Sequence, residues 1–344
     1  MNLRHASWTN RLAAAIGRTV GTRGAVLCFH GLDVDTAASP SSMHVRPEFL
    51  ETAVAVVQSV GTVVPLRELV TRHLARRSTA GLVALTADDA YVSLLAAEPF
   101  LKRTGVPFSV FAVSDALPNG RAYWWDRVEH GLSLARPERW RRFEDECGLP
   151  DAYRRGQPSE EGPLRPLRQW LLAEHAGRWP AAFEEPLSRL ETELGRRTGQ
   201  RSMTEAELVG FVARIGVDVG VHTVSHPVLP LLPDDEIVRE ITRCHDELRW
   251  RVRDVLPYLA LPFGLFDPRT LKRAAEAGME VSLTLAGEPL SRPFGPDRAV
   301  SRLCVVREYS PGILALKLSG VAPLLNRLRG QRGVPYPPLP SPTS

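Results

Sequence analysis

The sequence has few cysteines and no long uninterrupted apolar run. The four cysteines are widely separated, form no CxxC pair and mostly lie in apolar or helical patterns, which favours a reduced, cytoplasmic chain. No apolar run reaches the roughly 20 residues that a transmembrane helix needs. Residues 8–20 are interrupted by polar and basic side chains, so we expect no signal peptide.

The sequence also lacks a block of basic residues. Its net charge is only +4 over 344 residues, although its pI is about 9.0. The basic residues are nearly all Arg, interleaved with Asp and Glu, and no basic stripe alternates with aromatic residues. We therefore expect no nucleic-acid partner. A solvated Arg-rich surface explains the charge, and an anionic substrate or membrane surface is the alternative.

A repeated unit is present, in which an amphipathic helix ends at a Gly and an apolar strand follows. It occurs in residues 47–64, 93–113, 204–221 and 268–285, and Gly just past a helix is typical of a left-handed C′ position. Further strands at 25–30, 82–86, 258–261 and 303–306 bring the total to seven or eight. Short apolar strands alternating with helices predict an α/β fold with a closed or nearly closed parallel (β/α) barrel. No Gly-rich phosphate fingerprint follows the first strand, which disfavours a dinucleotide-binding fold.

The repeat defines the expected domain organisation. The barrel spans residues 25–310 and is interrupted at about 123–201 by an Arg-, Glu-, Trp- and Leu-rich stretch that we interpret as a helical insertion. Residues 1–24 form an N-terminal helical segment, and residues 333–344 form a Pro-rich tail. Residues 311–332 are predicted to form an amphipathic helix, which either packs on the core or makes a peripheral membrane contact.

The reactive residues of the sequence follow predicted strands. His30 follows the first strand, Asp88 and Asp89 follow the third, and His222 and His226 follow the fifth. The C-terminal ends of barrel strands meet at one face, where active sites form. Adjacent buried carboxylates repel each other unless a cation is present, and two His four residues apart suit shared coordination.

Each pair has an ordinary explanation when it is taken alone. An Asp-Asp pair after a strand is usually a turn or a helix cap, and HxxxH often occurs by chance. Their coincidence at corresponding strand ends favours a metal site with two imidazoles and a carboxylate. Such a set suits Zn²⁺, with Co²⁺, Ni²⁺, Fe²⁺ or Mn²⁺ as alternatives. A divalent ion would lower the pKa of bound water to about 7 and polarise a carbonyl.

Four segments together resemble the polysaccharide deacetylases, or NodB-homology carbohydrate esterases. LTADDAY at 85–91 resembles the first motif of that family, and GVHTVSHP at 220–227 resembles the His-Ser/Thr-x-x-His motif. LPFG at 261–264 is similar to the third motif, and VLCFH at 26–30 is similar to the opening strand of one branch. The resemblance covers residues 25 to 306 apart from most of the insertion. It implies the family's distorted (β/α) barrel.

The resemblance also implies an activity. Asp89, His222 and His226 would bind the metal, and Asp88 would be the base that deprotonates water. The metal and a backbone N–H near Phe263 would stabilise the oxyanion. The implied function is metal-dependent removal of acetyl groups from N-acetylated, or alternatively O-acetylated, sugars of a bacterial glycan or glycoconjugate. With no export signal expected, a cytoplasmic substrate is favoured, such as a nucleotide-linked, lipid-linked or small glycoside.

The chain departs from the family pattern at three alanines. Ala87 replaces an aromatic residue, which we expect either to widen the pocket floor or to leave it packed by another side chain. Ala90 replaces Gly and is strained if that position requires a positive φ. Ala260 stands where the family has an Arg, so Asp88 is expected to lack its orienting partner.

The family's general acid, the His of a Leu-x-His motif, is not visible after Leu285. His30 or Asp126 could protonate the leaving amine instead, and Arg302 could assist the charge. Structural roles, such as capping or ion pairing, are the alternative for all three residues. Trp125 and Asp126 lie in the YWWD segment that opens the insertion, and with Phe263 they are our candidates for substrate binding. Core anchoring is the alternative for the Trp pair.

Two other functions remain open at this point. The missing acid and Arg are consistent with a catalytically silent barrel that binds a glycan or a partner protein. The wide pocket expected from Ala87 is consistent with a metal amidase that acts on a non-sugar amide. Release of free amine from a panel of acetylated sugars would separate these functions from sugar deacetylation.

Overall fold

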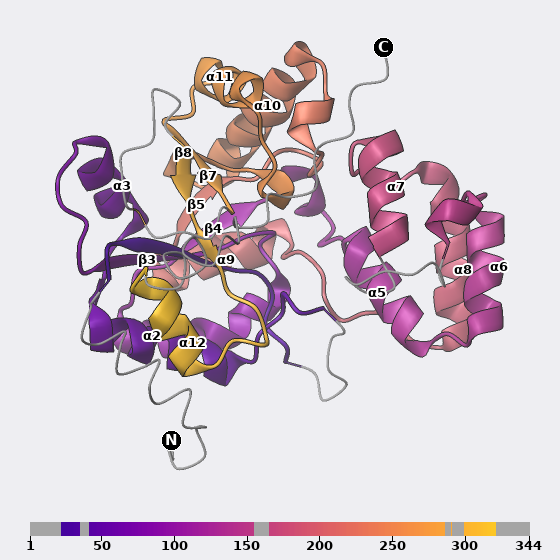
Figure 1. The fold of residues 1–344 in the computed structure, drawn as a ribbon, viewed down its shortest axis with the longest axis horizontal. Helices are drawn as coiled ribbons and strands as arrows, with labels where there is room; N and C mark the ends of the chain where they lie inside the picture. The colour runs from indigo at the N-terminus through magenta and orange to yellow at the C-terminus, as the bar shows by residue number, and fades with distance from the viewer. Residues whose placement is uncertain (1–21, 35–40, 155–164, 286–289, 291–298, 321–344) are drawn as a thin grey trace, which may run out of the picture.

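The fold is built on one parallel β-sheet (Figure 1). The computed structural model describes residues 22–34, 41–154, 165–285, 290 and 299–320. The strand order is β8-β7-β6-β5-β4-β3-β1-β9, and β2 pairs with the start of β3. The strands are β1 (Ala25–Phe29), β2 (Thr62–Val63), β3 (Leu82–Ala87), β4 (Ser109–Ala112), β5 (Asp218–Val221), β6 (Val255–Ala260), β7 (Val281–Thr284), β8 (Ala299–Ser301) and β9 (Leu303–Cys304).

The two ends of this sheet are joined by the chain itself. Strands β8 and β9 lie at opposite ends of the strand order, yet only Arg302 separates them in sequence. One continuous segment therefore pairs with β7 on one side and with β1 on the other. The sheet is thus a nearly closed parallel barrel, and the predicted fold class is confirmed. Strand β8 was not predicted as a separate strand.

Alternate strand residues divide into two cores. Val26, Ala84, Phe111, Tyr258 and Leu283 belong to an inner cluster, into which helix α3 (Leu66–Leu74) contributes three apolar side chains. The intervening strand residues belong to a larger cluster shared with the outer helices. This period of two is that of strands with both faces buried. Within the barrel a Cβ on Gly220 would lie 2.3 Å from the ring of Phe111, so only Gly fits there.

Helices cover the outside of the barrel (Figure 1). They are α2 (Pro47–Val60), α4 (Glu98–Thr104), α9 (Glu205–Ile215), α10 (Asp234–Arg251), α11 (Pro268–Glu276) and α12 (Pro311–Leu318). Gly105, Gly216 and Gly278 have the expected positive φ after their helices. Gly61 does not: its φ is −177°, and it is needed because a Cβ would lie 2.4 Å from the carbonyl oxygen of Gly81.

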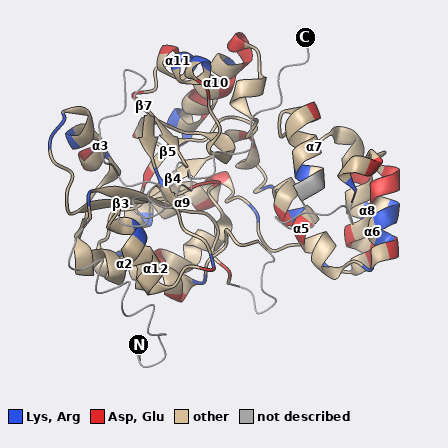
Figure 2. Cartoon of the chain, in the orientation of Figure 1, with Lys and Arg blue, Asp and Glu red and all other residues tan. Residues whose placement is uncertain are grey.

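Helices α5 (Trp124–Leu134), α6 (Pro137–Glu146), α7 (Arg165–His175) and α8 (Glu184–Leu194) form a group beside the barrel (Figure 1). They have a hydrophobic cluster of their own, which includes Trp140, Phe143 and Leu187. Both acidic and basic residues occur along α6 and α8 (Figure 2), and Arg142 of α6 pairs with Glu193 of α8. This group lies within the range predicted for the insertion.

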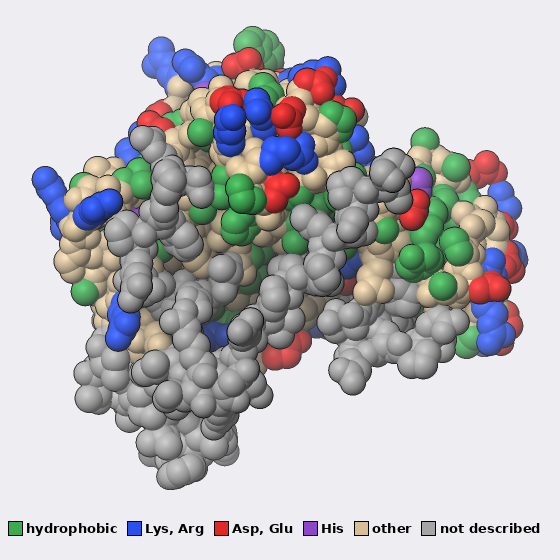
Figure 3. Space-filling view, turned by 45° about the horizontal axis from the view of Figure 1, so that its top comes forward, with side chains coloured by type: hydrophobic (Ala, Val, Ile, Leu, Met, Phe, Trp, Pro, Cys, Tyr) green, Lys and Arg blue, Asp and Glu red, His purple; other side chains and the backbone are tan. Residues whose placement is uncertain are grey.

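Helix α12 packs against α2 and buries Leu314, Ala315 and Leu318. Of the two alternatives given for this segment, the structure shows packing on the core and gives no support to a membrane contact. None of the described helices is long and apolar enough to span a bilayer. Acidic and basic side chains lie side by side on the face shown in Figure 3. Residues 1–21 of the predicted N-terminal segment 1–24, residues 321–332 of the predicted C-terminal helix and the predicted tail 333–344 lie outside the described residues.

Candidate functional site

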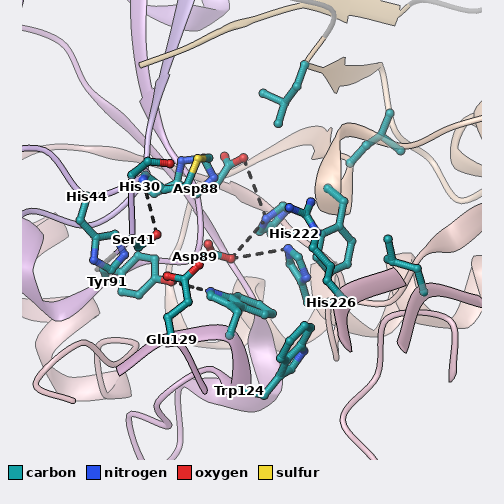
Figure 4. Close-up of a pocket in the computed structure, with 18 of the residues that line it drawn as sticks. His30, Ser41, His44, Asp88, Asp89, Tyr91, Trp124, Glu129, His222 and His226 are labelled. Atoms are coloured by element: carbon teal, nitrogen blue, oxygen red, sulfur yellow. Dashed lines mark hydrogen bonds and ion pairs between the residues drawn. The ribbon is translucent and has the colours of Figure 1, made fainter. Parts of the chain in front are cut away.

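A cavity of about 350 Å³ opens where the barrel strands end. From the barrel it is lined by His30, Asp88, Asp89, His222 and His226 (Figure 4). All five were selected from the sequence, and the structure brings them together from the ends of β1, β3 and β5. The inner apolar cluster and α3 close the barrel below them. The cavity therefore lies at the face where (β/α) barrels build active sites.

Asp89, His222 and His226 face one another. Oδ1 of Asp89 lies 3.5 Å from Nε2 of His222 and 3.7 Å from Nε2 of His226. Three ligands held about 2.1 Å from an ion in tetrahedral geometry are separated by about 3.4 Å, so this spacing fits a metal. Oδ1 of Asp89 is buried and has no hydrogen-bond partner among the described residues. The three residues form a candidate site whose donor set suits Zn²⁺.

Hydrogen bonding and burial prepare both imidazoles to act as ligands. Nδ1 of His222 donates to the carbonyl of Ala260 at 2.8 Å, which leaves Nε2 with its lone pair toward Asp89. Burial lowers the pKa of His226 to about 3, so that imidazole is neutral. Burial also opposes protonation of His222, but the carboxylates of Asp88 and Asp89 outweigh it and raise its pKa. A proton on His222 therefore competes with a cation for this site.

Asp88 is held by Arg302. The guanidinium donates two hydrogen bonds of 2.7 Å, one to each carboxylate oxygen, and both side chains are almost fully buried. Burial opposes ionisation of Asp88, but Arg302 outweighs it and holds the pKa of the carboxyl below its ordinary value. The expectation that Asp88 lacks an orienting partner is therefore wrong. The Arg comes from the junction of β8 and β9 and not from the end of β6.

Backbone strain is concentrated around these residues. Positive φ angles occur at non-glycine residues in the loops after β3, β5 and β6. These residues are Asp89 (67°), Ala90 (46°), Thr223 (68°), His226 (59°) and Phe263 (56°). The predicted strain at Ala90 is thus present. Tyr123 donates from its hydroxyl to the carbonyl of Asp89 at 2.7 Å, and the N–H of Met203 donates to Ala90 at 2.7 Å. Such strain persists where surrounding contacts fix the backbone, and it is frequent at functional sites.

Ala87 does not affect the cavity. Its side chain is fully buried in the cluster shared with the outer helices, as are those of Val83 and Leu85 on the same face of β3. The expected widening of the pocket floor is therefore wrong, because the pleat points residue 87 away from the barrel interior. The wide pocket expected from Ala87 was the reason for considering a non-sugar amidase, and the structure removes that reason.

The loop that carries both imidazoles is held by a buried glutamate of α10. Oε2 of Glu240 accepts hydrogen bonds from the backbone N–H groups of Val224 and Ser225, both at 2.9 Å. Its Oε1 accepts from the hydroxyl of Ser225 at 2.7 Å and from Arg178 at 3.1 Å. The sequence analysis missed Glu240, because a Glu within a charged helix carries no local signal of this role.

Of the three residues predicted to bind substrate, two line the cavity and one does not. Trp125 and Phe263 line the cavity, and their rings lie 4.8 and 4.6 Å from that of His226. Asp126 does not line it: its buried carboxyl group accepts from the hydroxyl of Tyr91 at 2.6 Å and lies 3.3 Å from His44. Any effect of Asp126 on a substrate would therefore pass through these neighbours. A backbone N–H near Phe263 was expected to stabilise the oxyanion. The N–H of the adjacent Gly264 already donates to the carbonyl of Leu261.

His30 lines the cavity beside Asp88. Burial lowers the pKa of His30, and its Nδ1 has no partner among the described residues. The cavity also exposes residues that the sequence analysis did not select, His44, Glu129 and Arg168. They come from the loop before α2 and from helices α5 and α7, and only the tertiary structure places them beside the predicted metal site.

Comparisons with known proteins agree with this architecture. Residues 194–282 match the polysaccharide deacetylase family model, a range that includes both imidazoles but not the two aspartates. No curated protein sequence is significantly similar. The resemblance predicted from the four motifs is nevertheless confirmed by the family model and by the solved structures.

The solved structures that the chain resembles share its fold at low identity. One is the deacetylase PplD of Streptococcus pyogenes in complex with acetate, at 14% identity, TM-score 0.56, covering 87% of this chain and 99% of that one. A second is IcaB from Ammonifex degensii, at 19% identity, TM-score 0.55, covering 87% and 98%. A third is a de-N-acetylase from Aggregatibacter actinomycetemcomitans, at 15% identity, TM-score 0.52, covering 85% and 98%. These likenesses show a NodB-type (β/α) barrel.

Proposed function

We propose that this protein is a metal-dependent deacetylase that hydrolyses the N-acetyl group of a sugar in a glycan or glycoconjugate. The observation that carries the proposal is the meeting of two sets of residues in one cavity. Asp89, His222 and His226 form a donor set for a divalent cation, and Asp88 is fixed beside it by Arg302. The family match and the deacetylases among the similar structures support this reaction.

The chain's own residues divide the work of hydrolysis. When bound, a divalent ion such as Zn²⁺ supplies Lewis-acid polarisation of the acetyl carbonyl and makes water acidic. Asp88 is ionised, and Arg302 orients its carboxylate to accept the proton of the attacking water. The C–N bond then breaks, acetate leaves, and the amine takes up a proton. His30, whose pKa burial lowers, is our candidate to relay to the amine the proton that Asp88 takes from water, since it lines the cavity next to Asp88.

Trp125 and Phe263 are proposed to contact the sugar beside the scissile bond, because both rings lie against His226. Acetate is the product that such a reaction releases, and the PplD structure contains acetate. We further propose that the substrate is cytoplasmic, on the basis of cysteine usage. O-acetylated sugars are the alternative substrates of the same chemistry.

Free-amine release from N-acetylated sugars tests the proposal, together with metal analysis of the purified protein. Asp89→Asn and His222→Ala should lose both metal and activity. Asp88→Asn should retain metal and lose turnover, because only the base is changed. Full activity of Asp88→Asn would refute its role. A silent binding barrel would instead bind glycans without releasing amine, but Arg302 removes one of the two reasons for considering it.

A further inference from the structure

A second group of potential metal ligands lies next to the candidate site around Asp89. Cys28 lies in β1, His30 directly follows that strand, and Asp88 follows β3. The thiol sulfur, one ring nitrogen and one carboxylate oxygen of these residues lie within 4.8 Å of one another. Cys28 and Asp88 are buried, and Figure 4 shows His30 and Asp88 next to each other. None of the three residues belongs to the first donor set, so a second ion would have ligands of its own.

The sulfur and the oxygen of this group already have the separation that a shared ion requires. Sγ of Cys28 lies 3.4 Å from Oδ2 of Asp88, to which it donates a hydrogen bond. Zinc binds thiolate sulfur at about 2.3 Å and carboxylate oxygen at about 2.0 Å, so tetrahedral geometry separates the two ligands by about 3.5 Å. A metal ion that takes the place of the thiol proton therefore needs little movement of either side chain.

The ion pair between Asp88 and Arg302 leaves a lone pair for this exchange. Arg302 donates one hydrogen bond to each oxygen of the carboxylate, and each of these oxygens has two lone pairs. At Oδ2 the second lone pair is the one that the Cys28 thiol occupies. The charge of Arg302 and an ion at the first site both oppose a second cation. The second site should therefore fill after the first and bind its ion more weakly.

His30 completes the group with an imidazole. Its Nδ1 is buried and has no hydrogen-bond partner among the described residues. Buried polar atoms nearly always have a partner, so this nitrogen calls for an explanation. An ion held between the thiolate of Cys28 and the carboxylate of Asp88 lies within reach of the imidazole and accounts for it.

The donor types determine which ions would bind. Thiolate sulfur selects soft and borderline ions such as Zn²⁺ and Cd²⁺, whereas Mg²⁺ prefers oxygen ligands. Burial raises the pKa of the Cys28 thiol, so the proton stays on sulfur until an ion displaces it. Binding breaks the S–H bond, forms a sulfur–metal bond and releases the proton to water.

We propose that Cys28, His30 and Asp88 form a second, inhibitory site for a thiophilic divalent cation such as Zn²⁺ or Cd²⁺. An ion there occupies an oxygen of the base and a nitrogen of the proton relay, so hydrolysis stops while it is bound. The inhibition rests on the proposed function, in which Asp88 accepts a proton from water. The site itself rests only on the three ligands, and it sets an upper limit on the zinc concentration at which the protein is active.

Titration of the metal-free protein with Co²⁺ tests the site without turnover. The first equivalent should fill the nitrogen and oxygen donors around Asp89, which give no sulfur-to-cobalt charge-transfer band. The second equivalent should produce that band in the near ultraviolet, and Cys28→Ser should abolish it. Cys304→Ser is the matched control, because Cys304 pairs with Cys28 across the sheet but is absent from the donor set found among the described residues. This control should keep the band.

Amine release measures the inhibition. Zn²⁺ beyond one equivalent should inhibit the unaltered protein and Cys304→Ser, whereas the same concentration of Mg²⁺ should not. Cys28→Ser should need at least about 100-fold more Zn²⁺ for half inhibition, since groups that merely orient metal ligands already change affinity by about 10- to 100-fold. Each protein is compared with its own activity at one equivalent of Zn²⁺.

Three outcomes would overturn the proposal. They are saturation at one ion per chain without a charge-transfer band, a band that Cys28→Ser leaves unchanged, and equal inhibition of the unaltered protein and Cys28→Ser by Zn²⁺. If Cys28→Ser does not fold, the metal content and the band of the unaltered protein in excess Co²⁺ still decide whether the site exists. A band that depends on Cys28 in a protein that never releases amine would support the second site and contradict the deacetylase function.

Discussion

Replacing Glu240 with Gln should weaken metal binding without altering any ligand. The carboxylate of Glu240 accepts from two backbone N–H groups and one hydroxyl of the loop between His222 and His226. That loop has positive φ at Thr223 and at His226, so its conformation needs external support. The Gln side chain has the same shape but carries no charge.

The expected magnitude follows from these bonds. A hydrogen bond to a charged group contributes about 1.5–3 kcal/mol, and a neutral one about 0.5–1.5 kcal/mol. The two N–H bonds to the oxygen that Gln keeps lose about 1 kcal/mol each, and the amide nitrogen cannot accept from the Ser225 hydroxyl, so the free energy of unfolding should fall by about 3 kcal/mol. Groups that orient metal ligands typically change metal affinity by about 10- to 100-fold, and we expect a loss in that range.

Glu236→Gln is the matched control. Glu236 also accepts from Arg178, at 3.3 Å, but it is partly exposed and, among the described residues, forms no hydrogen bond with the loop. Its ion pair should contribute less than about 1 kcal/mol. The metal dissociation constant can be measured by competition with a chromophoric chelator, and stability by denaturant unfolding. An unchanged dissociation constant for Glu240→Gln, or the same loss in both variants, would refute this role.

Three further outcomes are expected. Arg302→Lys should keep metal but lower kcat by about tenfold or more, because Lys cannot hold Asp88 with two parallel bonds; wild-type kcat would contradict this. Gly220→Ala should reduce the free energy of unfolding by about 1–3 kcal/mol or prevent folding, since its Cβ has no room inside the barrel, and unchanged denaturant stability would be inconsistent with the barrel packing. Glu207, whose pKa the Arg201 hydrogen bond lowers from 4.5 to about 2, should stabilise the fold above pH 4.5 and lose that contribution as the pH falls toward 2. In Glu207→Gln the free energy of unfolding should change less with pH over that range, by a difference of less than about 1 kcal/mol from the unaltered protein. An identical pH profile for both proteins would show that the ion pair between Glu207 and Arg201 does not affect stability.

The barrel, and the meeting of Asp89, His222 and His226, could be predicted from sequence because both depend on local patterns. Apolar strands ending in Asp89 or His222 place those residues at one face of a parallel barrel whatever the rest of the chain does. The error at Ala87 was avoidable in the same terms. Strand residues alternate, so a residue next to the inward-facing Asp88 must point outward.

Contacts between distant segments could not be predicted in this way. Arg302 meets Asp88 across 214 residues, and the pairing depends on how β8 and β9 close the sheet. Glu240 lies on a helix with many exposed charged residues, and Glu129 follows Asp126 and Arg127 on a largely buried helix, so no local pattern distinguishes either residue. Their placement follows from which helix packs against which loop, and that is set by the tertiary fold.

Arg302 takes part both in the closure of the barrel and in the orientation of the base Asp88. The segment 299–304 pairs with β7 through its first half and with β1 through its second, and the N–H of Arg302 donates to the carbonyl of Thr284 between them. The proposed metal ligands lie in the loops after β3 and β5, and neither of these strands pairs directly with β8 or β9. A change that loosens this segment should therefore release Asp88 from its guanidinium while the metal site persists. Metal binding and turnover are thus expected to be separable in this fold, because Arg302 orients the base Asp88 but makes no hydrogen bond to Asp89, His222 or His226.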